Sequence, residues 1–180
     1  MERSLTHIAL FAALIAILGL VPPIQLSFGV PITAQSMGIM LCGTVLGAKR
    51  GTLAVLLFLA LVAAGLPLLA GGRGGLGVFA SPTVGYLIGF VLAAFVTGLA
   101  VEKTTLPVGV AAGAGALIGG VGVLSVSGIL GMAVMLDKTV GEAAYLAAAF
   151  LPGDILKAVL AGFITNALAR MRPASVLSRA

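Results

Sequence analysis

A carboxylate and an ammonium group lie three positions apart in an otherwise apolar stretch near the carboxyl end of the chain. The stretch, residues 151–158, reads LPGDILKA. Residues three apart on a helix share a face, so Asp154 and Lys157 would point the same way. A carboxylate accepts hydrogen bonds from N–H groups and an ammonium donates to an oxygen. Together they could bind a ligand that carries both kinds of polar group side by side.

The same two residues also allow a simpler interpretation. A charged side chain in the middle of a membrane helix costs about 2.5–3.5 kcal/mol, and such side chains normally face a bundle interior or a cavity. Asp154 and Lys157 could be an ion pair that neutralises itself near the start of a helix. Both interpretations place the pair inside the protein, but only the first gives it a ligand.

Residues for covalent or metal chemistry are scarce. The chain has one histidine, His7, near its amino end and one cysteine, Cys42, in an apolar run. A histidine-based zinc site and a Ser–His pair inside a membrane are therefore excluded, as is an intramolecular disulfide. The sequence contains no phosphate loop of the type GxxxxGK[ST]. We expect no enzymatic activity, no metal and no cofactor, and no ATP hydrolysis by this chain through a phosphate loop.

The composition is that of a membrane protein. Of 180 residues, 61% are hydrophobic and 8% charged, whereas soluble domains carry about 45–50% apolar and about 25% charged residues. The mean hydropathy is +1.26. We expect residues 1–180 to form a single integral membrane domain embedded in the lipid bilayer. The net charge of +5 comes with no basic cluster longer than Lys49-Arg50, so a nucleic-acid partner is not expected.

Six apolar runs predict an all-α fold of six transmembrane helices, each needing about 20 residues. The runs cover residues 5–20, 32–46, 52–69, 83–101, 107–136 and 145–169. The first run is not followed by a signal-peptide cleavage site, so we interpret it as a retained helix. The fifth run is longer than a bilayer requires, and it is expected to tilt, protrude or break near residues 125–128.

The distribution of basic residues predicts the orientation of these helices in the membrane. An even number of spans puts both termini on one face. That face would hold seven basic residues, namely Arg3, Lys49, Arg50, Lys103, Arg170, Arg172 and Arg179, and the other face would hold Arg73 and Lys138. Because Lys and Arg accumulate in cytoplasmic loops, both termini are predicted to be cytoplasmic in a multi-pass protein of a prokaryotic plasma membrane.

With this orientation the irregular segments meet on the external side. They are the connection at residues 25–35, the glycine-rich connection at residues 70–82 and the start of the sixth run. Non-helical backbone at membrane depth persists only where it is buried in protein or lines a cavity. Their convergence therefore indicates a pocket that opens outward.

Five motifs in a fixed order resemble the BioY family, the biotin-binding S-components of energy-coupling factor transporters. They are GVPITAQ (29–35), GAKRG (47–51), GGRGGLG (71–77), PTVGYLIGF (82–90) and PGDILK (152–157). The resemblance covers about residues 5–169. It implies a six-helix subunit that captures biotin from outside and works with a transmembrane coupling subunit and cytoplasmic ATPase subunits.

The resemblance also implies which side chains contact the vitamin. Asp154 and Lys157 match the N–H donors and the carbonyl of the ureido group, while Thr33, Gln35 and Tyr86 lie in segments that align with the binding region of the family. For these last three, hydrogen bonding between helices is the alternative, or interfacial anchoring in the case of Tyr86.

Outside these five residues, the sequence offers one further possible ligand contact and two pairs of small residues with helical spacing. Arg73 could meet the biotin carboxylate or face solvent. Members of this transporter class dock on the coupling subunit through an Ala-x-x-x-Ala face, which we assign to Ala9 and Ala13, although packing inside the bundle would use the same spacing. The glycines at Gly109 and Gly113 are assigned to internal packing.

Two other functions remain open from the residues alone. In an autonomous secondary carrier of a small polar vitamin, Asp154 and Lys157 would form an ion relay. In a purely structural assembly subunit, the same pair would lock two helices together.

Overall fold

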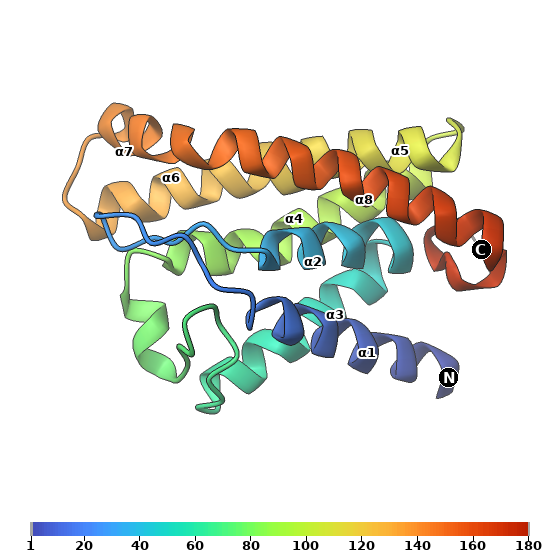
Figure 1. Cartoon of the computed structure of the whole chain (residues 1–180), viewed down its shortest axis with the longest axis horizontal. Helices are drawn as coiled ribbons and strands as arrows, with labels where there is room; N and C mark the ends of the chain where they lie inside the picture. Colours follow the sequence, from blue (N-terminus) through green and yellow to red (C-terminus); the bar gives the residue numbers. More distant parts are fainter. Residues whose placement is uncertain (1, 180) are drawn as a thin grey trace.

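The computed structural model describes residues 2–179, and side chains from residue 4 onward. Its regular elements are helices, arranged as six rods that run along one common direction (Figure 1). The rods are α1 (Glu2–Leu18); α2 (Gln35–Leu41) with the π-helix η1 (Cys42–Leu46); α3 (Ala48–Ala63); α4 (Val84–Lys103); α5 (Val108–Gly115), the π-helix η3 (Ala116–Val123) and α6 (Leu124–Met135); and α7 (Val140–Ala147), the 3-10 turn η4 (Ala148–Phe150) and α8 (Leu151–Met171). Short 3-10 turns are η2 (Leu76–Ala80), η5 (Pro173–Ser175) and η6 (Leu177–Arg179). The predicted all-α fold of six helices is confirmed.

Two features of the helices differ from the sequence prediction for local reasons. The third helix ends at Ala63 rather than near residue 69, because Gly65 adopts a φ of +105° and Pro67 follows it. The fifth rod does not break at residues 125–128. It stays helical over 28 residues, from Val108 to Met135. Its middle part is the π-helix η3, a local widening of the helix in a stretch that is rich in glycine.

The first three rods are short, and this leaves room for the irregular segments. Helix α3 has 16 residues, about 24 Å at about 1.5 Å per residue, which is less than the hydrocarbon thickness of about 30 Å. Residues 19–34 and 64–83 occupy the remaining depth at one end of the bundle (Figure 1). Each is braced by a single antiparallel bridge, Ile24 with Ile32 and Leu69 with Arg73.

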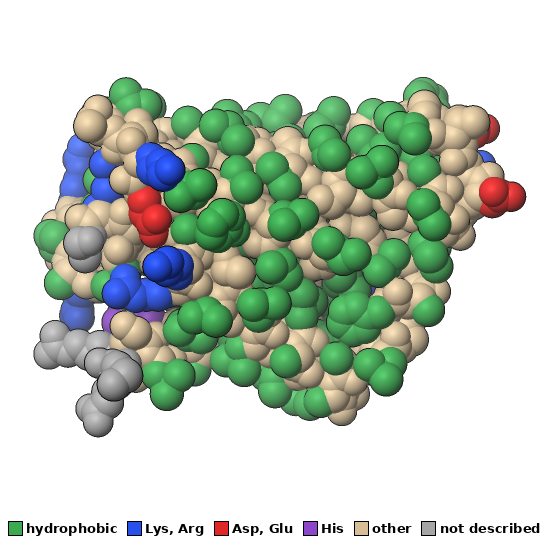
Figure 2. Space-filling view, turned by 180° about the vertical axis from the view of Figure 1, so that it is seen from behind, with side chains coloured by type: hydrophobic (Ala, Val, Ile, Leu, Met, Phe, Trp, Pro, Cys, Tyr) green, Lys and Arg blue, Asp and Glu red, His purple; other side chains and the backbone are tan. Residues whose placement is uncertain are grey.

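Both termini lie at the opposite end of the bundle (Figure 1). Lys and Arg side chains gather at this end, while hydrophobic side chains form a belt between the two ends (Figure 2). The distribution is the one expected when the terminal end is cytoplasmic. The bundle is closed here by the carboxyl-terminal turn, where the hydroxyl of Ser178 donates to the carbonyl of Thr44 at 2.6 Å and the guanidinium of Arg179 donates to the carbonyl of Thr104 at 2.6 Å.

Candidate ligand-binding site

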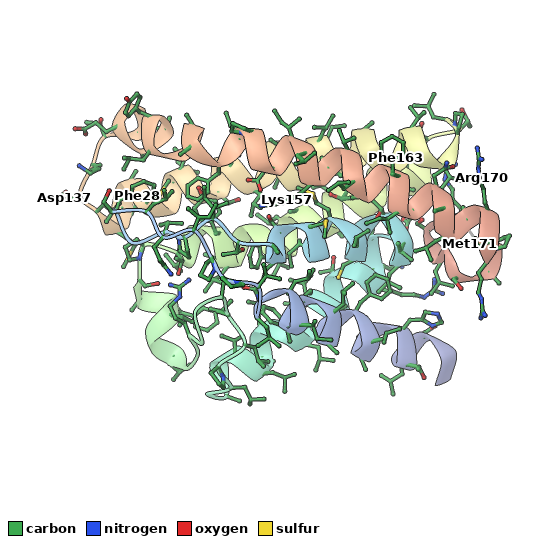
Figure 3. All side chains as sticks on the ribbon, viewed as in Figure 1. Phe28, Asp137, Lys157, Phe163, Arg170 and Met171 are labelled. Carbon is green, nitrogen blue, oxygen red and sulfur yellow. The ribbon has the colours of Figure 1, made fainter. Side chains whose placement is uncertain are left out.

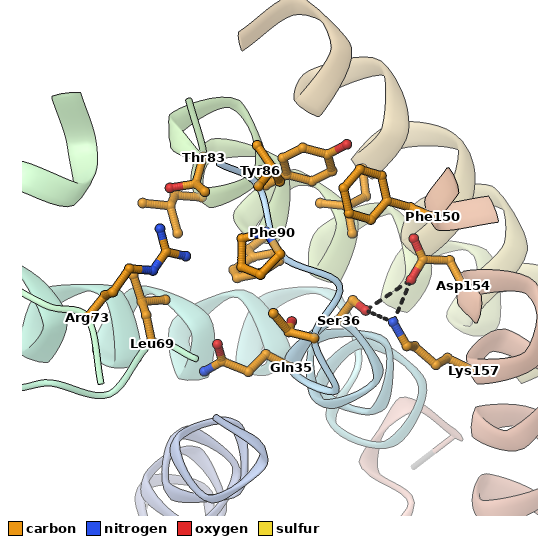
Figure 4. Close-up of a pocket in the computed structure, with 15 residues that line it drawn as sticks. Gln35, Ser36, Leu69, Arg73, Thr83, Tyr86, Phe90, Phe150, Asp154 and Lys157 are labelled. Atoms are coloured by element: carbon orange, nitrogen blue, oxygen red, sulfur yellow. Dashed lines mark hydrogen bonds and ion pairs between the residues drawn. The ribbon is translucent and has the colours of Figure 1, made fainter. Parts of the chain in front are cut away.

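A pocket lies at the end of the bundle that carries the irregular segments. Its walls come from both irregular segments, the start of α2, the first turns of α4, one residue of α6, the turn η4 and the start of α8 (Figure 4). The lining residues are Val30, Pro31, Thr33, Gln35, Ser36, Leu69, Arg73, Thr83, Tyr86, Leu87, Phe90, Leu124, Phe150, Asp154 and Lys157. All five residues predicted to contact a ligand are therefore brought to one cavity.

Asp154 and Lys157 lie on the same face of α8, as their spacing predicts, and form an ion pair with 2.8 Å between Nζ and Oδ1. Pro152 stands in the first turn of this helix, where its missing N–H costs nothing, and so the chain can bend into α8 just before the pair. Ser36 joins them from α2. Its hydroxyl donates to Oδ1 of Asp154 at 3.1 Å and accepts from Nζ of Lys157 at 3.0 Å (Figure 4).

This arrangement leaves unused hydrogen-bonding capacity beside the cavity. Both hydrogen bonds to the carboxylate of Asp154 end on Oδ1, so Oδ2 is available to another donor. Lys157 has three N–H groups and uses two of them. The group of three side chains, Ser36, Asp154 and Lys157, thus offers one strong acceptor and one strong donor next to each other.

Ser36 was not singled out in the sequence. Ser36 directly follows Gln35 at the start of an apolar run, and its sequence position does not distinguish it from an ordinary helix residue. Its buried position against a charged pair is set by the packing of α2 on α8, which is a contact between segments far apart in the chain.

Gln35 is buried and its amide is already engaged. Nε2 donates to the carbonyls of Ile15 at 3.1 Å and Leu68 at 3.0 Å, and Oε1 accepts from the backbone N–H of Ala70 at 2.9 Å. The side chain therefore ties the end of α1 and the 64–83 segment to the start of α2. It lines the pocket while holding the pocket wall in place.

Arg73 is half-buried at the tip of the turn that Gln35 holds, and it points over the pocket toward Thr83 (Figure 4). Its Nε donates to the carbonyl of Ala70 at 3.3 Å. Burial lowers the pKa of the Arg73 guanidinium from its usual value, but an arginine starts so high that it keeps its charge. The structure thus places a cation at the wall opposite Asp154.

Tyr86 and Phe150 form an aromatic wall. Their ring centroids are 5.5 Å apart, and Phe28 packs edge-on against Phe150 at 6.1 Å. The ring of Tyr86 lies where a Cβ on Gly128 would be, so the absence of a side chain at Gly128 makes room for it. The hydroxyl of Tyr86 is buried and has no hydrogen-bond partner among the described residues.

Thr33 is half-buried in the 19–34 segment, and it adds a hydroxyl to the lining of the pocket. The space enclosed by all these residues is about 50 Å³, which is smaller than the roughly 300–1,000 Å³ of typical ligand pockets. A vitamin-sized ligand therefore requires the irregular segments or the lining side chains to move outward. Within residues 2–179, no group of three His, Cys, Asp or Glu side chains could hold a metal ion.

Ala9 and Ala13 lie away from the pocket, on the outer surface of α1. Both are exposed, whereas Ala12 is buried and Ala16 half-buried on the inner face of the same helix. Large exposed neighbours, Leu10 and Ile17, border the two small residues. Of the two alanine pairs, the one at positions 12 and 16 packs inside the bundle, and the pair Ala9 and Ala13 is free for an external contact.

Comparison with known proteins gives a consistent result. A model of the BioY family matches residues 2–174. A protein of Rhodobacter capsulatus described as "Biotin transporter BioY" is 53% identical, with the match covering 99% of this chain and 100% of the relative. A protein of Rhizobium etli with the same description is 49% identical over 92% of each chain.

A solved structure supports the same conclusion. The crystal structure at 2.1 Å of the S-component for biotin from an ECF-type ABC transporter superposes with a TM-score of 0.88. It is 35% identical and covers 94% of this chain and 92% of its own. The sequence match, the shared fold and the order of the motifs agree, and this chain belongs to the BioY family.

Proposed function

We propose that this chain binds biotin in the pocket described above and delivers it for uptake as the substrate-binding subunit of an energy-coupling factor transporter. Its relatives are described as biotin transporters, and the solved structure is that of an S-component for biotin. The observation that carries the proposal is the group formed by Ser36, Asp154 and Lys157, with one carboxylate oxygen and one ammonium N–H left for a ligand.

The ureido group of biotin fits these two free positions. Its N–H donates to Oδ2 of Asp154, and its carbonyl accepts from Lys157. A ligand without one of these groups would leave a charge buried and unpaired, which makes the contact selective. The apolar ring system then lies against Tyr86 and Phe150, and the chain ending in a carboxylate extends toward Arg73 on the opposite wall.

The five predicted contact residues take different parts in this arrangement. Asp154 and Lys157 bind the ureido group directly. Tyr86 supplies an aromatic face and a hydroxyl that has no other partner in the described chain. Thr33 adds a hydroxyl to the lining that can hydrogen bond to the ligand. Gln35 acts by fixing the wall that carries Arg73.

The chain works as a single membrane domain and depends on partners for energy. We assign the exposed small surface at Ala9 and Ala13 to docking on a transmembrane coupling subunit, because small residues four apart allow close helix approach. Cytoplasmic ATPase subunits then supply the energy.

Replacing both Ala9 and Ala13 by leucine should abolish co-purification of the coupling subunit while leaving biotin binding intact. Ala144→Leu, at an exposed alanine on α7, is the matched control.

Calorimetric titration of the purified protein with biotin tests the proposed ligand. Biotin and desthiobiotin, which keeps the ureido group, should both release heat on binding. Iminobiotin, in which a cationic guanidinium replaces the ureido, should be rejected by Lys157. Absence of heat with biotin would instead favour a purely structural subunit. Uptake into vesicles that contain this chain alone, driven by a pH jump, would favour an autonomous carrier.

A further inference from the structure

A second hollow lies on the outside of the bundle, where α5 packs against α8. It has a volume of about 450 Å³ and shares no residue with the biotin pocket. Three glycines form its floor. A Cβ on Gly162 would come within 3.0 Å of the carbonyl oxygen of Gly109 and 3.1 Å of the Cα of Gly113, so the two helix backbones touch. Gly113 itself has open space where its side chain would be.

The walls of this groove are apolar and exposed. Val110 is 57% exposed, Val159 43% and Phe163 66%. They belong to the hydrophobic belt of the bundle, where the surrounding medium is lipid. A slot with a glycine floor and aliphatic and aromatic walls has the shape and polarity for one acyl chain.

The groove changes character at its cytoplasmic end. There it is bordered by Asn166 and by Arg170 in the last turn of α8, which lies at the same end as the termini (Figure 3). Arg170 is exposed, and its guanidinium has no ion-pair or hydrogen-bond partner within the described part of the chain. None of the residues that line the groove is acidic. The apolar slot thus leads directly to an unpaired cation and an amide at headgroup level.

A comparable groove on the same protein has no charged residue at either end. It lies between α4 and α6, has a volume of about 440 Å³ and also has close-packed glycines, Gly85 and Gly131. No charged residue lines it. Any phospholipid chain can lie in either of these two grooves, but of the two, the groove between α5 and α8 is the one with a charged end that can select a headgroup.

We propose that the groove between α5 and α8 is a binding site for an anionic phospholipid of the cytoplasmic leaflet. One acyl chain lies over Gly113 and Gly162, and Arg170 pairs with the phosphate while the Asn166 amide donates a hydrogen bond to the headgroup. Basic pockets between membrane helices on the cytoplasmic side favour anionic headgroups for this electrostatic reason. The proposal depends on the membrane orientation and is independent of the identity of the transported ligand.

Native mass spectrometry of the purified protein tests this site. The protein is mixed with equal amounts of phosphatidylglycerol and phosphatidylcholine that carry identical acyl chains. We expect a preference of about fivefold for phosphatidylglycerol, the size expected for one cation near an anionic headgroup. Arg170→Gln should remove the preference, whereas Arg172→Gln, at an exposed arginine two positions away, should keep it.

A second variant separates the slot from the charge. Gly113→Leu places a side chain in open space, so the fold should persist, and it should displace the lipid although Arg170 is intact. The proposal is overturned if the wild type shows no headgroup preference, if Arg170→Gln and Arg172→Gln weaken it equally, or if Gly113→Leu has no effect. Maleimide labelling of a Gly113→Cys variant gives a further test, because the single native cysteine, Cys42, is buried. If the coupling subunit protects the Gly113→Cys thiol from maleimide, the groove is occupied by protein rather than by lipid, and the proposal is overturned.

Discussion

The hydroxyl of Ser36 donates to Oδ1 of Asp154 at 3.1 Å, across 118 positions of the chain. Together with the bond from Lys157, this bond occupies one carboxylate oxygen, Oδ1, and leaves the other, Oδ2, for a ligand. Replacing Ser36 with alanine should weaken biotin binding by about tenfold, the value of one hydrogen bond to a charged group. Calorimetry measures the change. Ser127→Ala, on the groove between α4 and α6, should leave affinity unchanged, and equal losses in both variants would contradict a specific role for Ser36.

The ion pair between Asp154 and Lys157 can be tested as a unit. Asp154→Asn or Lys157→Met alone leaves one buried charge without its partner, so each should lower the free energy of unfolding by about 3 kcal/mol and abolish biotin binding. The double variant should regain stability but not binding. Thermal unfolding and calorimetry on the three variants provide both readouts. A double variant that still binds biotin would reduce the pair to a structural ion pair.

Gln35 should matter for the outer wall of the pocket. Gln35→Leu removes three hydrogen bonds to backbone groups of α1 and the 64–83 segment, and we expect a loss of about 2–3 kcal/mol in stability. Hydrogen exchange of residues 66–75 should become faster than in the wild type. Gln25→Leu, at an exposed glutamine of the other irregular segment, serves as the control and should exchange normally.

Tyr86 offers a case in which stability and binding should move in opposite directions. Its buried hydroxyl lacks a partner among the described residues, so Tyr86→Phe should raise the free energy of unfolding by about 1 kcal/mol. If the hydroxyl bonds to biotin, as proposed, the same variant should bind biotin more weakly. Unchanged affinity in a stabilised variant would restrict Tyr86 to an aromatic contact.

If Arg73 contacts the biotin carboxylate, the effect of replacing Arg73 on affinity should depend on whether the ligand carries that carboxylate. Arg73→Gln should weaken biotin binding by about tenfold or more, as expected for a partly buried charged pair, and should leave the affinity for neutral biotin methyl ester nearly unchanged. A double-mutant cycle with the two ligands measures the interaction. Equal losses for both ligands would show that Arg73 acts through the shape of the wall.

The sequence alone was sufficient for the features that depend on composition and on local spacing. Six apolar runs, the basic residues at one end and the shared face of Asp154 and Lys157 all appear in the structure. The spacing of small residues on the first helix fits Ala9 with Ala13 and Ala12 with Ala16 equally well, and only the structure shows that Ala9 and Ala13 face outward.

The features that could not be predicted depend on contacts between distant segments. Nothing near Ser36 indicates that α2 will bring it against α8, and nothing near Gln35 indicates that its amide will be used by α1 and a loop. The end of α3 at Ala63 follows from the left-handed conformation of Gly65, which the apolar composition of the run obscures. The π-helix η3 depends on how the fifth rod fits against its neighbours.

The amide of Gln35 bonds to Ile15 on one side and to Leu68 and Ala70 on the other. Displacing the Arg73 turn without displacing the first helix would strand these polar groups in a dry interior. The Arg73 turn and the helix that carries Ala9 and Ala13 are therefore mechanically linked through one side chain, so that a displacement of the turn at the outer end must also shift α1.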